Sequence, residues 1–170
     1  MKYLFTLSIA LLSSFSMLGQ SDAIETLFRD YQSNVNFTTV YISPKMFQMA
    51  YKATDSHDEK ELASIVKDLK GLRIMSTTND PSKSFAEASK RLNIPSYETL
   101  AIVKDRDADV KFLTKETNGA ISELLLLIGG KSKFVMMSFT GKIDLNKIAR
   151  LSKKLDIDGA EYLDKVNNRK

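Results

Sequence analysis

The chain lacks cysteine and tryptophan, and its 170 residues include one histidine and three prolines. Without a thiol, the sequence excludes disulfide bonds, thiol catalysis, cysteine-ligated zinc and a lipid carried on an N-terminal cysteine. The one imidazole, His57, falls in a polar connector between acidic residues, and no G-x-S-x-G motif supplies a nucleophile for it. We interpret His57 as an exposed loop residue and assign no catalytic residue.

Neither sign of charge dominates, since 25 basic and 21 acidic residues give a formal net charge of +4. This balance is too mild for a nucleic-acid-binding surface, so no nucleic-acid partner is expected. One dense basic cluster falls near the C-terminus and comprises Lys147, Arg150, Lys153 and Lys154. We interpret it as the solvated face of a helix; the alternative is weak contact with an anionic surface, which salt would screen.

Long apolar runs are also absent, apart from one near the N-terminus. There, Lys2 precedes an apolar run over residues 3–12, which is thinned by serines and followed by a small residue, Gly19. This is the plan of a secretory signal peptide over residues 1–20, with cleavage expected near Gly19 or Gln20. The alternative is an uncleaved anchor, although a spanning helix needs about 20 apolar residues. We expect an exported protein, periplasmic or secreted, that is not a lipoprotein and has no integral membrane segment after cleavage.

The rest of the chain contains no repeat and no long linker. Residues 21–160 are therefore expected to form one domain, followed by a polar tail over residues 161–170. Caps, prolines and apolar periodicity predict helices over residues 22–31, from Ser43-Pro44 onward, and over 62–69, 79–92 and 145–155; β-rich runs predict strands over 37–43 and 72–77.

Residues 97–140 predict a meander of four strands joined by short turns. Asn118-Gly119 lies between two β-rich runs and favours a type I′ turn, in which both central residues take positive φ. A two-residue loop there predicts four cross-strand pairs: Val110 with Leu127, Phe112 with Leu125, Leu113 with Leu124, and Thr114 with Glu123. A second turn over residues 129–132 predicts Phe134 beside Leu127 and Met136 beside Leu125.

The middle strand of this meander is apolar on both faces, whereas an antiparallel sheet with one wet face alternates. The predicted fold class is α+β: a mostly antiparallel sheet of about six strands, including the C-terminal four-stranded meander, with helices packed on it. One face carries five apolar residues: Leu124, Leu126, Val135, Met137 and Phe139. We predict that these five residues form a candidate interaction face, for a protein partner or for a second copy in a homodimer.

Glu123 interrupts the apolar run of its strand, and the expected register places Thr114 and Ser138 beside it. We interpret it as a strand end that reaches solvent, because a buried carboxylate would need a positive partner and none is placed on that face. The alternative is a polar pocket inside the sheet.

The acidic turn of Asp105, Asp107 and Asp109 matches part of the EF-hand spacing, with Glu116 at the twelfth position. The sixth position is Val110 instead of the glycine that the loop bend requires. A solvated hairpin turn is therefore preferred over a calcium site. No metal ligand and no cofactor are assigned.

The pattern as a whole resembles a family of Bacteroidetes envelope proteins, domain of unknown function 4252. The residues that carry the likeness are 42–47, 69–74, 110–112, 121–124, 134–135 and 140–145. The resemblance covers nearly all of the chain after the leader, and its motifs mark fold positions, not catalytic ones. It implies export to the cell envelope and no assigned activity. Some members look like lipoproteins, from which this chain departs by lacking the cysteine.

Three functions follow from these observations. The leading hypothesis is a non-enzymatic envelope domain that binds another protein, or itself, through the candidate interaction face. The second is a carrier of a small apolar molecule or lipid, in a cavity between sheet and helices. The third is a hydrolase, which would have to rely on carboxylates and hydroxyls alone.

Overall fold

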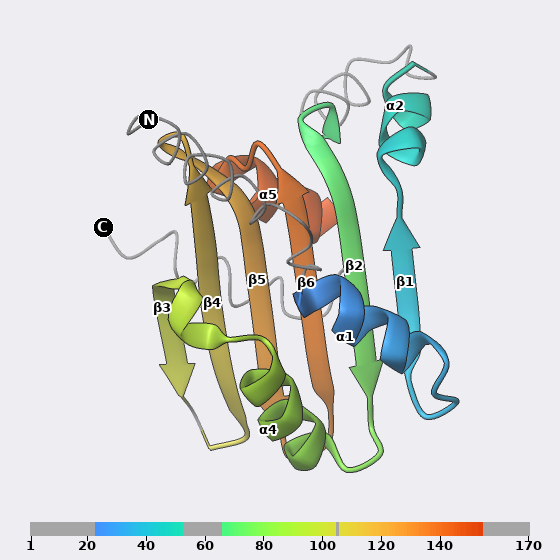
Figure 1. Ribbon diagram of the computed structural model, residues 1–170, viewed down its shortest axis with the longest axis vertical. Helices are drawn as coiled ribbons and strands as arrows, with labels where there is room; N and C mark the ends of the chain where they lie inside the picture. The colour runs from blue at the N-terminus through green and yellow to red at the C-terminus, as the bar shows by residue number, and fades with distance from the viewer. Residues whose placement is uncertain (1–22, 53–65, 105, 155–170) are drawn as a thin grey trace, which may run out of the picture.

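The computed structural model describes residues 23–52, 66–104 and 106–154 (Figure 1). Its elements follow in chain order: α1 (Ala23–Gln32), β1 (Thr38–Ile42), α2 (Pro44–Lys52), β2 (Leu69–Thr77), α4 (Pro81–Arg91), a 3₁₀ turn (Ile94–Ser96), β3 (Glu98–Lys104), β4 (Ala108–Thr117), β5 (Ala120–Gly130), β6 (Phe134–Gly141) and α5 (Leu145–Lys154). The six strands form one sheet in which every neighbouring pair is antiparallel. The predicted α+β fold class is confirmed.

The strand order is β1-β2-β6-β5-β4-β3. Strands β3 to β6 make the predicted meander, in which each strand pairs with the next along the chain. The order of the first two strands could not be read from the sequence: β2 pairs with β6, and β1 adds outside β2. The two edges of the sheet are therefore β1 and β3.

Helices α1 and α4 cover one face of the sheet, which we call the front face because it is turned toward the viewer in Figure 1. In α1, the residues predicted from helical spacing are all buried: Ile24, Leu27, Phe28 and Tyr31. They pack with Leu113, Leu125, Leu127 and Met136 of the sheet. Helix α4 begins at Pro81, where the missing N–H costs nothing at a first helical position.

The opposite, rear face is covered by Ile148 and Ala149 of α5 and by Phe47 of α2. All five residues of the candidate interaction face lie in this second core, and each is at most 4% exposed. The prediction of an open apolar face at these residues is therefore corrected. The surplus apolar surface is real, but the chain's own helices cover it.

The first hairpin has the predicted loop and a shifted register. Asn118 and Gly119 have φ of 55° and 73°, as a type I′ turn requires, and Thr117 pairs with Ala120. Glu116 then pairs with Ile121, but Lys115 pairs with Glu123, so a bulge at Ser122 offsets the ladder by one residue. Beyond the bulge, Val110 pairs with Ile128, Phe112 with Leu126, Leu113 with Leu125, and Thr114 with Leu124.

The turn of the second hairpin lies one residue later in the chain than predicted. Strand β5 runs to Gly130, and the observed pairs are Gly129 with Phe134 and Leu127 with Met136. Each residue of β5 therefore pairs with a residue of β6 two positions further along the chain than predicted. A shift of two residues leaves each side chain on its predicted face of the sheet. Strand β2 starts at Leu69 instead of Leu72. The signal peptide, His57, residues 62–65 of the helix predicted over 62–69 and the polar tail lie outside the described residues.

Candidate functional site

Glu123 is buried, which corrects the prediction of a solvent-exposed strand end. Only 6% of the residue is exposed. The Tyr97 hydroxyl donates to its Oε2 at 3.3 Å, and the Ser138 hydroxyl donates to its Oε1 at 3.2 Å. Lys115 Nζ lies 3.8 Å from Oε2 and 4.1 Å from the centroid of the Tyr97 ring. Of the alternative, a polar pocket inside the sheet, the structure shows the buried polar surroundings of the carboxylate.

The acidic turn is split between a strand and a loop. Asp107 pairs with Lys131 at 3.2 Å in an exposed ion pair, Asp109 belongs to β4, and Asp105 lies outside the described residues. Among the described residues, no group of three or more histidines, cysteines or carboxylates could hold a metal ion.

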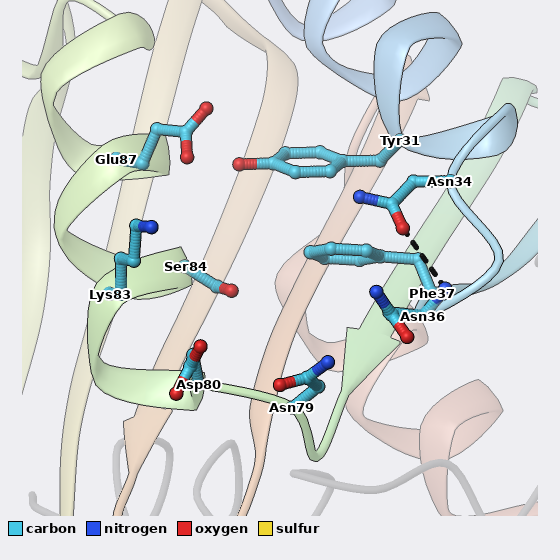
Figure 2. A pocket seen from close by; sticks show the side chains of 9 residues that line it. All are labelled: Tyr31, Asn34, Asn36, Phe37, Asn79, Asp80, Lys83, Ser84 and Glu87. Carbon is cyan, nitrogen blue, oxygen red and sulfur yellow. Dashed lines mark hydrogen bonds between the residues drawn. The ribbon is translucent and has the colours of Figure 1, made fainter.

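A pocket of about 200 Å³ lies between the end of α1 and the start of α4 (Figure 2). We call it the polar pocket. It is lined by Tyr31, Asn34, Asn36, Phe37, Asn79, Asp80, Lys83, Ser84 and Glu87. Tyr31, the asparagines and Phe37 approach it from α1 and the loops, and the other residues come from the first turns of α4 (Figure 2).

Thr77 fixes the two loops of the polar pocket side by side. Its hydroxyl donates to the carbonyl of Asn36 at 2.7 Å and accepts from the backbone N–H of Asn79 at 3.0 Å. Asn34 folds its own loop, because its Oδ1 accepts the backbone N–H of Asn36 at 3.0 Å. Asp80 has a φ of 45°, a left-handed conformation that β-carbon sterics disfavour. The rim is thus built by hydrogen bonds and a constrained turn.

Tyr31 and Ser84 are the buried polar residues among those that line this pocket. Tyr31 is 6% exposed, and its ring stacks on Phe37 with centroids 4.1 Å apart. The phenol points across the pocket toward Glu87 (Figure 2). Burial, reinforced by the charge and the close polar contact of Glu87, raises the pKa of Tyr31 to about 12.

Arg91, the last residue of α4, pairs with Glu87 and with Asp30. Its guanidinium contacts the Glu87 carboxylate at 3.5 Å and makes a close ion pair with Asp30 of α1. The Asp30 carboxylate raises the pKa of Arg91 above its ordinary value, which keeps the guanidinium charged. The negative charge of Glu87 therefore faces a fixed positive one.

A second pocket of about 220 Å³ lies beside the β1 edge, and we call it the arginine pocket. Its lining residues are Glu25, Phe28, Arg29, Gln32, Tyr41 and Arg73. The Arg73 guanidinium lies 5.1 Å from the Tyr41 ring centroid and 3.8 Å from Glu25. Two arginines against one glutamate give this pocket a positive balance.

The two sheet edges differ in how they are protected. Strand β1 contains no charged residue and no proline, its ladder with β2 has no bulge, and Val40 and Tyr41 are 41% and 50% exposed. Strand β3 begins with Glu98, ends with Lys104 and has a bulge at Leu100. Charges and bulges are the usual means of blocking strand addition, so β1 is the open edge of the sheet within the described residues.

The polar pocket was missed from sequence because the order of the first strands was not known. Thr38 at the start of β1 pairs with Ser76 near the end of β2. This pairing brings the loop at Asn36 beside the turn at Asn79. An antiparallel pairing of strands 37–43 and 72–77 was the signal that would have placed these asparagines together.

The basic cluster lies on α5, where Lys147 approaches Asp68 at 4.0 Å and Arg150 is exposed; the side chains of Lys153 and Lys154 lie outside the described set. No helix in the described part of the chain is long and apolar enough to cross a membrane.

Fold and pockets together define an α+β domain with one antiparallel sheet, two polar hollows on its front face and one open sheet edge. The chain belongs to the family described as Domain of unknown function (DUF4252), whose model matches residues 31–151. The match spans all six strands and confirms the resemblance seen in the sequence. No curated protein and no solved structure matches the chain.

Proposed function

We propose that this chain is a non-enzymatic binding domain of an exported protein, and that it takes an extended segment of a partner protein along the edge of β1. Export is supported by the signal-peptide plan of residues 1–20. Binding is supported by one observation above the others: β1 is an edge strand without charge, proline or bulge. An added strand would extend the antiparallel sheet by main-chain hydrogen bonds.

The arginine pocket gives such a strand a side-chain preference. Tyr41 belongs to β1 and lines this pocket together with Arg29 and Arg73. A strand added beside β1 places every second side chain on the front face, next to Tyr41. Because the pocket has a positive balance, we expect an aspartate or glutamate at that position of the partner. Main-chain pairing then supplies affinity, and the pocket supplies selectivity.

Selection from a display library of random ten-residue peptides tests this proposal directly. Enriched peptides should combine β-branched residues with an acidic residue at a constant position. Val40→Lys places a charge on the open edge and should weaken a selected peptide by roughly tenfold or more. Leu100→Lys, an equally drastic change at the exposed edge of β3, is the matched control and should leave the affinity unchanged.

Arg29→Gln separates the pocket from the edge. Arg29 is exposed on α1, so this variant should fold normally, bind neutral strands as before and lose the preference for the acidic position. The proposal fails if no peptide is enriched, or if Val40→Lys and Leu100→Lys bind alike. It also fails if sedimentation shows a dimer that Val40→Lys dissociates, because a second copy would then be the occupant of the edge.

A further inference from the structure

We infer that the arginine pocket is a binding site for a small organic carboxylate, a molecule with a single anionic group on a ring-sized body. The observation that points to a ligand is Arg73, whose side chain is 16% exposed and makes no hydrogen bond within the described residues. Such a ligand uses the same pocket as the partner strand proposed above. It needs no strand beside β1, however, so the two proposals can fail independently.

The guanidinium of Arg73 is short of acceptors. Its Nη2 lies 3.8 Å from Oε2 of Glu25, beyond the roughly 3.2 Å of a hydrogen bond. In the described part of the chain, the remaining interaction of its charge is with the Tyr41 ring, whose centroid lies 5.1 Å from Cζ. A guanidinium carries only donors, and a mostly buried one without acceptors is costly. A ligand carboxylate removes this cost by accepting two N–H groups side by side.

Arg29 brings a second guanidinium to the pocket from α1. Helix α1 lies across the front of β1 and β2, the two strands on which Tyr41 and Arg73 pair with each other (Figure 1). Glu25 precedes Arg29 by about one helical turn, but Arg29 makes no ion pair with Glu25 or with any other described residue. Both guanidinium groups can therefore turn to one ligand.

The charge of the lining favours a ligand with a single negative charge. The charged lining residues are Glu25, Arg29 and Arg73, one carboxylate and two guanidinium groups, with a formal sum of +1. A carboxylate brings this sum to zero, whereas a dianion leaves an excess of negative charge and a cation is repelled. The planar fork of an arginine also matches the two oxygens of a carboxylate.

The pocket is larger than a carboxylate alone requires. Its volume of about 220 Å³ corresponds to roughly seven waters, which is enough for a molecule on the order of ten non-hydrogen atoms. Tyr41 is 50% exposed, and Phe28 packs against its ring with centroids 6.4 Å apart, so the wall beside the cations is aromatic. A carboxylate on a single ring fits this size and this wall, with the ring beside Tyr41.

A titration followed by ¹H–¹⁵N NMR tests the inference. The probes are benzoate and cyclohexanecarboxylate. Benzamide and benzylamine are the neutral and cationic counterparts of similar shape, and inorganic sulfate is the dianion. At least one carboxylate probe should shift the amides of residues 25–32, 39–42 and 72–74 with a Kd below about 20 mM, which corresponds to a binding free energy of a few kcal/mol. The three counterparts should bind more weakly.

Arg29→Gln and Arg106→Gln form a matched pair. Both replace an exposed arginine by a neutral side chain, but only Arg29 lines the pocket. Arg29→Gln should weaken the carboxylate by roughly 5- to 10-fold, the loss of one charge-assisted hydrogen bond, whereas Arg106→Gln should bind as the parent does. Glu25→Gln removes the carboxylate of the lining and should tighten binding by up to about fivefold. Structural damage to the pocket would not produce such a gain.

Val40→Lys separates this site from the proposed strand site. Val40 does not line the pocket, so the variant should bind the carboxylate as the parent does, even though its β1 edge is blocked. The inference is overturned if neither carboxylate binds with a Kd below about 20 mM, a limit above which such binding has little specificity. It is equally overturned if the shifts fall elsewhere, if a counterpart binds as tightly as the carboxylates, if Glu25→Gln weakens binding, or if Arg29→Gln and Arg106→Gln bind alike.

Discussion

Glu123 lies in the interior although its sequence neighbours gave it no visible partner. The bulge at Ser122 explains this placement, because it shifts Lys115 into the position opposite Glu123. A one-residue shift moves every side chain to the other face of a strand. The positive partner that seemed missing is therefore on the adjacent strand. Tyr97 and Ser138 satisfy the carboxylate from two further directions.

Replacing Glu123 by alanine should destabilise the domain by about 2–3 kcal/mol, because two buried hydroxyls lose their charged acceptor. Glu123→Gln keeps an acceptor oxygen and should cost less. Glu116→Ala on the same hairpin is the control: Glu116 is exposed, so its removal should change the free energy of unfolding by less than about 0.5 kcal/mol. Urea unfolding measures all three variants. Equal stabilities for Glu123→Ala and Glu116→Ala would contradict a structural role for this carboxylate.

Tyr31 should make stability depend on alkaline pH. Its pKa is about 12 in the native protein, against 10.0 for an unperturbed tyrosine. The unfolded chain therefore loses this proton first, so the contribution of the neutral phenol is complete below pH 10 and is lost as the pH rises toward 12. Compared with Tyr31→Phe, the parent should lose more stability between about pH 9 and about pH 11.5 in urea unfolding. Parallel pH curves would show that the phenol ionises as freely in the native state as in the unfolded one.

At the level of elements, the hairpin at Asn118-Gly119 has one feature that the sequence predicts, the turn, and one that it does not predict, the bulge. The turn was predictable because few residues tolerate positive φ, and the structure has it. The bulge was not predictable, since Ser122 is an ordinary strand residue and only the contacts of both strands decide which residue is left unpaired. The faces of the second hairpin were predicted correctly, because a shift of two residues preserves them.

Gly129 shows why α4 docks where it does. A β-carbon built at this position would lie 2.5 Å from Cγ of Phe85. The Phe85 ring, on α4, therefore occupies the space that the missing side chain of glycine leaves free. The same ring meets Phe134 edge-on, with centroids 6.4 Å apart. Gly129 and Phe134 pair with each other across β5 and β6, and together they form the surface that Phe85 of α4 packs against.

Gly129→Ala should therefore destabilise the domain by about 1–3 kcal/mol through overpacking, and Phe85→Leu should relieve part of this cost in the double variant. Gly119→Ala is the matched control. At Gly119 nothing lies within 4 Å of the added carbon, but φ is +73°, so its cost of about 1 kcal/mol comes from backbone strain alone. Phe85→Leu should not relieve that strain. A double-mutant cycle in urea unfolding measures the coupling, and additivity of Gly129→Ala with Phe85→Leu would argue against the contact.

At the level of the whole molecule, the sheet is buried on both faces by helices that differ in chain position. The front cover comes from α1 and α4, and the rear cover comes from α5 and Phe47. The sequence shows that both faces of the meander are apolar. The sequence of an amphipathic helix, however, does not indicate which face of the sheet that helix covers. The five residues of the candidate interaction face were therefore recognised as needing a cover, and the cover was assigned to a partner instead of to the chain itself.

Leu126 tests this internal cover. It is 2% exposed in the rear core, so Leu126→Asp buries a carboxylate among Phe47, Ile148 and other apolar groups. That cost should exceed much of the roughly 5–15 kcal/mol by which a domain is stable, and the variant should lose cooperative unfolding and NMR dispersion. Leu126→Ala should remain folded with a loss of about 2–5 kcal/mol. Ile102→Asp is the control, since Ile102 is 54% exposed on β3 and its variant should stay folded. A folded monomer of Leu126→Asp arising from a dimeric parent would contradict the burial of this face by the chain's own helices.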